Sequence, residues 1–207
     1  FTMHTKELIQ ACYNGSSEMV NQFSNAVITF LFNIILMRLA GPNGVAAITI
    51  LLYGQFLFNA FYLGFSIGIS PIVGYQYGAG NRKELKRIYR ISFRFVSISS
   101  VIIAFAAVYL SSGIVTIFTD DPKTHALAVT GFGIFAYNFL FSGFNIASSG
   151  FFTALSDGKS SAIISFCRTL LFTVISLLVL PRFFGVNGAW LAIPVAEFVT
   201  LFLSIFF

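Results

Sequence analysis

Six apolar segments alternate with short polar or glycine- and proline-rich connections along the chain. Their approximate bounds are residues 8–38, 45–77, 95–118, 126–153, 160–180 and 189–207. A helix needs about 20 apolar residues to cross a hydrocarbon core of ~30 Å. The pattern therefore predicts an all-α membrane protein, a six-helix transmembrane bundle that forms a single domain.

Composition supports this class and excludes others. Of the 207 residues, 57% are hydrophobic and only 9% are charged, whereas soluble domains carry about 25% charged residues. A soluble enzyme, a nucleic-acid-binding domain and a disordered chain are excluded. The net charge of +5 does not indicate nucleic acid, because the basic residues cluster in a few connections. Cys12 and Cys167 show no metal-binding spacing, so we expect no metal and no cofactor.

The distribution of basic residues predicts the orientation in the membrane. With six crossings, alternate connections share a side. One side carries eight basic residues and the other three; the eight are Lys6, Arg82, Lys83, Lys86, Arg87, Arg90, Arg94 and Lys159, and the three are Arg38, Lys123 and Arg182. Positive residues accumulate on the cytoplasmic side. We therefore expect a multi-pass protein of the cell (plasma or inner) membrane, with the basic loop 81–94 in the cytoplasm and membrane lipid as a partner.

Both ends of the chain look incomplete. It begins with Phe1 and stops inside the apolar run Leu201–Phe207. We expect it to be a piece of a longer protein.

Polar residues recur at helical spacing inside three of the segments. The sets are Asn14, Glu18, Asn21, Asn25 and Thr29 on the first segment, Gln55, Asn59, Tyr62, Ser66 and Ser70 on the second, and Asn138, Ser142, Asn145 and Ser149 on the fourth. Such residues either face a polar cavity or join helices by hydrogen bonds. The candidates for a substrate cavity are Gln22, Gln55, Asn59, Tyr62, Tyr137, Asn138, Ser142 and Asn145.

Three charged residues lie within the segments. Arg168 and Glu197 fall at similar depth on consecutive helices, which predicts a buried structural ion pair. Glu18 lies near the amides of Asn21 and Asn25 and is the candidate for binding a coupling proton or cation. The alternative is that Glu18 caps a helix break near Gly15 or pairs with a lysine.

One motif suggests an enzyme. Gly64–Gly68 matches the G-x-S-x-G nucleophile pattern around Ser66, which makes an intramembrane serine protease an alternative. The two histidines, His4 and His125, lie outside or at the edge of the apolar segments. We expect Gly64 and Gly68 to allow close helix packing instead.

A longer motif resembles the second-helix signature of multidrug and toxic compound extrusion (MATE) transporters. It runs from Gly64 to Asn81, with Ser70-Pro71, Gly74-Tyr75-Gln76-Tyr77-Gly78 and Gly80-Asn81, and a basic segment follows. Residues 14–18, 118–121 and 185–194 also resemble that family at its usual spacings. Together these stretches span nearly the whole chain.

The resemblance implies a fold and a function. Members of the family have two six-helix lobes, and this chain resembles the C-terminal lobe, which would pair with an N-terminal lobe. They export small amphipathic or cationic substrates in exchange for Na⁺ or H⁺, and some branches bind the cation at acids on the first and fourth helices. Here Asn25 stands at the first position, and Ser142 and Asn145 lie on the fourth helix, so the coupling ion stays open. The function also stays open to a lipid-linked flippase of related fold or to a channel.

Overall fold

The computed structural model of the chain describes residues 9, 12 and 16–206, with the side chains of 16–18, 20 and 21 excepted. The elements are α2 (Ser16–Gly78), α3 (Arg82–Phe118), α4 (Pro122–Phe135), the 3-10 turn η1 (Ala136–Asn138), α5 (Phe139–Ala154), α6 (Gly158–Phe166), the π-helical turn η2 (Cys167–Phe172) and α7 (Thr173–Phe206). Across these described residues there is no β-strand. The predicted all-α class is confirmed.

Two glycines divide α2 and α7 into arms. Gly41 has φ 65° and ψ −155°, and Gly185 has φ 56° and ψ −133°. Positive φ is disfavoured for residues with a Cβ, so glycine is the residue suited to these corners. The break at Gly41 gives α2 a first arm (residues 16–40) and a second arm (residues 42–78). The run α4–η1–α5 is continuous, and the run α6–η2–α7 is broken at Gly185. The described residues therefore form six helical arms: 16–40, 42–78, 82–118, 122–154, 158–184 and 186–206.

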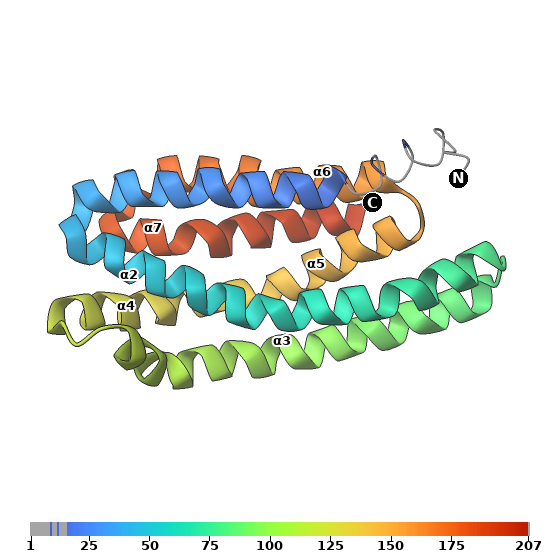
Figure 1. Cartoon of the computed structure of the whole chain (residues 1–207), viewed down its shortest axis with the longest axis horizontal. Helices are drawn as coiled ribbons and strands as arrows, with labels where there is room; N and C mark the ends of the chain where they lie inside the picture. Colours follow the sequence, from blue (N-terminus) through green and yellow to red (C-terminus); the bar gives the residue numbers. More distant parts are fainter. Residues whose placement is uncertain (1–8, 10–11, 13–15, 207) are drawn as a thin grey trace, which may run out of the picture.

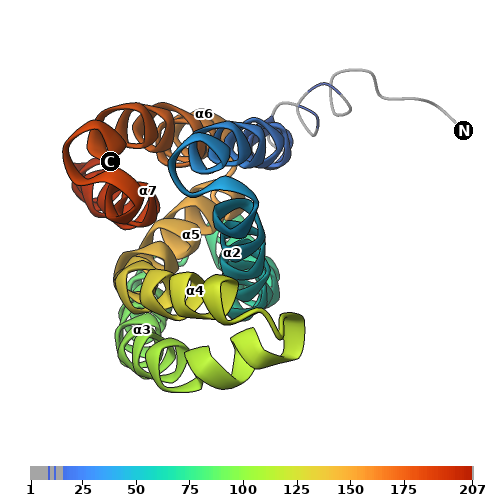
Figure 2. The same ribbon diagram turned by 90° about the vertical axis from the view of Figure 1, so that its left-hand side faces the viewer.

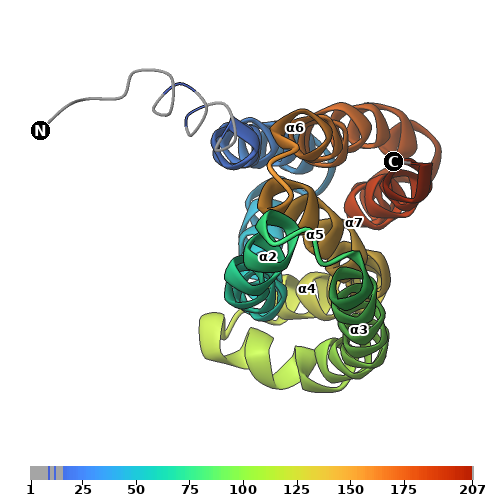
Figure 3. The same cartoon turned by 90° about the vertical axis from the view of Figure 1, so that its right-hand side faces the viewer.

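The arms pack in two groups around α5. The first arm of α2 lies with α6 and α7, while the second arm lies with α3 and α4 (Figures 1 and 2). α5 runs between the groups and contacts α2, α3, α6 and α7 (Figure 3). Within the part of the chain that the structure describes, four continuous helical stretches are long and apolar enough to cross a membrane: Gln22–Gly78, Arg82–Phe118, Pro122–Ala154 and Gly158–Phe206.

The main hydrophobic core lies toward the end of the molecule that carries the glycine corners. Its largest fully buried side chains are Phe32, Leu36, Ile48, Leu51, Phe132, Phe135, Leu177 and Trp190. A smaller cluster surrounds Tyr62 and Phe139 between α2, α3 and α5. Most remaining large apolar side chains are exposed, which fits a surface that contacts lipid.

The basic loop predicted at residues 81–94 is helical instead. α3 begins at Arg82, where the side chain of Asn81 accepts a hydrogen bond from the backbone N–H of Glu84 at 3.2 Å. Basic residues are good helix formers, so charge marked the edge of the apolar segment but not the end of the helix.

The close packing predicted at Gly64 and Gly68 occurs elsewhere. Both glycines have nothing within 4 Å of an added Cβ. At Gly143 an added Cβ would lie 2.6 Å from the Tyr62 ring, so α5 approaches α2 closely there. The sequence identified glycines but not the partner that each one faces.

Candidate functional site

The first arm of α2 carries a polar edge on its surface. The side chains of Gln22, Asn25 and Thr29 are exposed, and Asn25 and Thr29 lie within a turn of the middle of the arm. Phe30, also exposed, lies about 140° around the helix from Asn25, on the side where Phe23 and Ile34 are exposed. The arm thus shows a polar edge and a separate apolar face. Asn14 lies outside the described residues, and the side chains of Glu18 and Asn21 lie outside the described side chains.

The polar sets on the second and fourth predicted segments meet inside the bundle. Ser142 Oγ donates to Asn59 Oδ1 at 3.3 Å, which links α5 to α2. The Tyr62 hydroxyl donates to the Phe139 carbonyl at 3.1 Å and lies 3.4 Å from Ser100 Oγ. Tyr62 and Ser142 are buried, so these contacts join α2, α3 and α5 rather than face an open space.

The 3-10 turn η1 places two adjacent candidates in opposite environments. Asn138 is fully buried, and neither of its amide atoms has a hydrogen-bond partner among the described residues. Tyr137 is 61% exposed. Gln55, on the second arm of α2, is half-buried. Of this group, Tyr137 and Gln55 are the ones whose side chains reach the surface.

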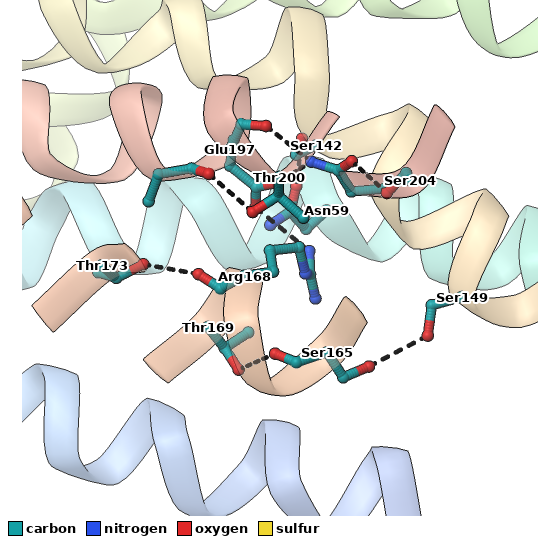
Figure 4. A network of polar contacts seen from close by, with 12 residues as sticks. Asn59, Ser142, Ser149, Ser165, Arg168, Thr169, Thr173, Glu197, Thr200 and Ser204 are labelled. Atoms are coloured by element: carbon teal, nitrogen blue, oxygen red, sulfur yellow. Dashed lines mark hydrogen bonds and ion pairs between the residues drawn. The ribbon is translucent and has the colours of Figure 1, made fainter. Parts of the chain in front are cut away.

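A buried polar network joins α5, η2 and α7 (Figure 4). Arg168 Nη1 lies 3.2 Å from Glu197 Oε1, and both side chains are at most 11% exposed. Asn145 Nδ2 donates to the other carboxylate oxygen at 2.7 Å and to the Glu197 carbonyl at 2.9 Å. Ser204 Oγ donates to Asn145 Oδ1 at 2.9 Å. The structure therefore brings the predicted pair together and adds Asn145, predicted as a cavity residue, to it.

A second group of hydroxyls connects α5 to α6: Ser149 belongs to the polar set predicted on the fourth segment, whereas Thr153, Ser161 and Ser165 were not predicted. Ser149 Oγ lies 2.8 Å from Ser161 Oγ and 3.1 Å from Ser165 Oγ, and Thr153 Oγ1 lies 2.8 Å from Ser161 Oγ. The four-residue spacings of Ser149 with Thr153 and of Ser161 with Ser165 are the signals that identify this contact.

These positions revise the cavity prediction. Tyr62, Asn138, Ser142 and Asn145 are buried within this lobe, and all but Asn138 are engaged in hydrogen bonds between helices. Gln22, Asn25, Gln55, Asn59 and Tyr137 retain exposed or half-buried side chains. The joining role that polar residues often have in membrane bundles accounts for Tyr62, Ser142 and Asn145.

Within the G-x-S-x-G segment, Ser66 packs against α5, while Gly64 and Gly68 are exposed. Ser66 is buried, and its hydroxyl occupies the space that a Cβ at Gly150 would need. His125 contacts Thr116 Oγ1 through Nε2 at 3.2 Å, near the link between α3 and α4. Among the described residues, no three His, Cys, Asp or Glu side chains gather in a group that would hold a metal.

Two aspartates outside the apolar stretches, Asp121 and Asp157, cap helices. Hydrogen bonds from the side chain and backbone of Ser160 lower the pKa of Asp157 at the start of α6. The backbone N–H and the hydroxyl of Thr124 lower the pKa of Asp121 in the same way at α4. Both carboxylates are thereby held in their charged form at the ends of the bundle.

Comparison with known proteins gives matches along the chain. The MatE family model matches residues 19–178. The multidrug export protein MepA of Staphylococcus haemolyticus (strain JCSC1435) is 27% identical over 147 residues, which cover 70% of this chain and 31% of that protein.

Solved structures share the fold. A MATE protein in complex with MaL6 superposes with a TM-score of 0.91 and 18% identity, over 100% of this chain and 47% of that one. An outward-facing multidrug resistance MATE family transporter of the MOP superfamily superposes with a TM-score of 0.88 and 18% identity, over 100% of this chain and 48% of that one. A point mutant of the Vibrio cholerae MATE transporter VcmN superposes with a TM-score of 0.89 and 17% identity, over 98% of this chain and 46% of that one. The chain spans about half the length of these structures and about a third of the curated relative.

Proposed function

Because the chain belongs to the MatE family, we propose that it is one six-helix lobe of a membrane transporter that exports several drugs or organic cations in exchange for Na⁺ or H⁺. The name of the matched relative, a multidrug export protein, supports export as the activity. The coverage of solved transporters, close to half, supports the presence of a second lobe. By its resemblance to the family's second-helix signature and linked motifs, this chain is the C-terminal lobe.

The exposed polar edge on the first arm of α2 carries the proposal. Asn25 and Thr29 lie near the middle of an arm that is long enough to cross the membrane. A polar side chain that faces lipid at that depth is costly, so such residues normally face a water-filled space or another part of the protein. A cleft between two lobes provides that space, with Gln22, Asn25 and Thr29 on its wall.

Other polar and aromatic groups at the surface of the lobe suit a flat, apolar cation. Gln55, Asn59 and Tyr137 add half-buried or exposed polar groups, and aromatic rings are frequent on the surface of the lobe. Aromatic faces attract cations, while a few polar groups orient the ligand. A lipid-linked flippase is less well supported, because an anionic headgroup requires free basic groups and Arg168 is paired with Glu197.

Glu18 is the proposed coupling residue of this lobe. Glu197, the buried acid of the described part, already accepts from Arg168 and Asn145, so it has less capacity to bind an exchanging cation. Glu18 lies one turn or two from Asn21 and Asn25 on the same arm. In the full-length protein, Glu18→Gln should abolish ion-dependent efflux while the protein still folds. Efflux at the wild-type rate would move the coupling site to the other lobe.

The cleft is tested by thiol accessibility in the full-length protein with Cys12 and Cys167 replaced by serine. Asn25→Cys should react with a membrane-impermeant maleimide, and a transported drug should slow the reaction. Phe30→Cys is the matched control, since it is also exposed on this lobe but lies on the apolar face. Equal reactivity at the two positions would contradict the cleft. Drug-driven ion movement in vesicles, with Na⁺ and pH varied separately, then identifies the coupling ion.

The same labelling tests the orientation. We propose that the end with Arg82, Lys83 and Lys159 is cytoplasmic. Lys83→Cys should then react in inside-out vesicles and stay protected in intact cells.

A further inference from the structure

A groove opens between the first turns of α3 and the last turn of α5, apart from the proposed cleft. It encloses about 320 Å³, at the lower end of the range for ligand sites. The residues that line it are Leu85, Lys86, Tyr89, Arg90, Phe151 and Leu155. Apolar and aromatic side chains thus form most of the lining, with two basic side chains beside them.

The groove lies at the boundary of the apolar part of the lobe. α5 ends at Ala154, and the polar residues Ser156 and Asp157 follow. α3 has 37 residues, or about 55 Å, and exceeds a hydrocarbon core of ~30 Å. Its basic first turns continue past the turn between α5 and α6 (Figure 1). Lys86 and Arg90 therefore fall at headgroup depth, together with Tyr89 and the Phe151 ring that contacts it.

The two basic residues of the groove have no acidic partner in the described part of the chain. Lys86 and Arg90 are four residues apart, so they lie on one face of α3. The acids at this end are otherwise engaged, because Glu84 lies 3.7 Å from Arg87 and Asp157 caps α6. An anion from outside the chain is the complementary ligand.

An aromatic row leads from the groove along α3 and α5. The Tyr89 ring meets Phe151 edge-on with centroids 5.8 Å apart, and it lies 4.2 Å from Phe93. Phe93 in turn lies 5.8 Å from Phe144. This row offers an apolar track that starts beside the two cations, which is the arrangement of a phosphate joined to an acyl chain.

We propose that the groove binds an anionic phospholipid from the surrounding bilayer. Lys86 and Arg90 hold the phosphate, and an acyl chain lies over Tyr89, Phe151 and Leu155. Basic pockets between membrane helices bind anionic headgroups in this way. The site is independent of the transport proposal, since it shares no residue with the cleft or with Glu18.

Native mass spectrometry of the full-length protein with added phosphatidylglycerol or phosphatidylcholine tests the site. In the wild type, phosphatidylglycerol should bind at least tenfold more tightly than phosphatidylcholine. Lys86→Gln/Arg90→Gln should weaken phosphatidylglycerol about 25-fold, or about fivefold for each basic residue near the surface. Leu155→Trp keeps the charge but fills the groove, and it should weaken binding as well.

Arg82→Gln/Lys83→Gln is the matched control, because it removes the same charge from the same helix outside the groove lining. It should weaken binding less than fivefold. Equal losses in the two double variants would mean diffuse attraction and would overturn the proposal, as would unchanged binding in Leu155→Trp. Displacement of the lipid by equimolar glycerol 3-phosphate would show a phosphate site rather than a lipid site and would overturn it too. All variants are first compared by thermal unfolding.

Discussion

Removal of one partner from the buried Arg168–Glu197 pair should destabilise the lobe strongly. In the structure, Arg168 Nη1 lies 3.2 Å from Glu197 Oε1. In Arg168→Met, the Glu197 carboxylate loses this cation and keeps only Asn145 as a side-chain donor. In Glu197→Gln, the guanidinium stays at 11% side-chain exposure with no anion, and its Nε has no partner among the described residues. Breaking a buried pair in this way costs about 3–5 kcal/mol.

Thermal unfolding of the purified full-length protein in detergent measures the effect. At about 2–4 °C per kcal/mol for a domain of this length, each single variant should lower Tm by roughly 6–20 °C. The double variant Arg168→Met/Glu197→Gln carries no buried charge and should lower Tm less than either single variant.

An exposed ion pair serves as the control. Glu84→Gln removes the contact with Arg87, which spans 3.7 Å at 72% and 36% side-chain exposure. Such pairs contribute about 0–1 kcal/mol, so Tm should change by at most a few degrees. Additive losses in the double variant would refute the coupling between Arg168 and Glu197. A loss in Glu84→Gln as large as in Arg168→Met would refute the argument from burial.

Two further predictions follow from packing and from helix capping. Gly143→Ala places a Cβ 2.6 Å from the Tyr62 ring and should destabilise the protein by about 1–3 kcal/mol, measured by thermal unfolding. Gly64→Ala, with open space around it, should be neutral or stabilising, and similar losses in the two variants would contradict the contact between Gly143 and Tyr62. The pKa values of Asp157 and Asp121 are lowered in the folded protein, so their stabilisation is present above the ordinary carboxyl pKa near ~3.9 and is lost as the pH falls through the lower folded values. Asp121→Asn/Asp157→Asn should therefore unfold with a smaller loss of Tm between pH 5 and 2 (about three pH units) than the wild type, and an unchanged loss would contradict the capping role.

The membrane class followed from the sequence because charge is excluded from hydrocarbon, and this exclusion leaves long apolar segments. The corners at Gly41 and Gly185 fall between predicted segments, the first between 8–38 and 45–77 and the second between 160–180 and 189–207. The start of α3 was not predicted, since a helix can continue beyond the membrane on basic residues. Periodicity gives a residue's position around its own helix, but it does not give the residue at which that helix ends outside the membrane.

The site was harder to predict for a related reason. Depth along consecutive helices was enough to pair Arg168 with Glu197, since similar depth brings opposite charges together. Asn145 was assigned to a cavity because the spacing on α5 gives a face but not the helix opposite it. The same limit explains Gly64 and Gly143, which look alike in sequence although only the second has a neighbour within contact distance.

The corner at Gly41 leaves almost no slack between the two arms of α2. A single residue departs from helical geometry, and Pro42 fixes the next φ. The link between α3 and α4 is longer, with residues 119–121 outside both helices. The two arms of α2 are therefore joined through one residue, and the angle between them is set by φ and ψ at Gly41. In the proposed transporter, the arm that carries Asn25 and the arm that carries Asn59 would therefore move relative to each other about this one corner.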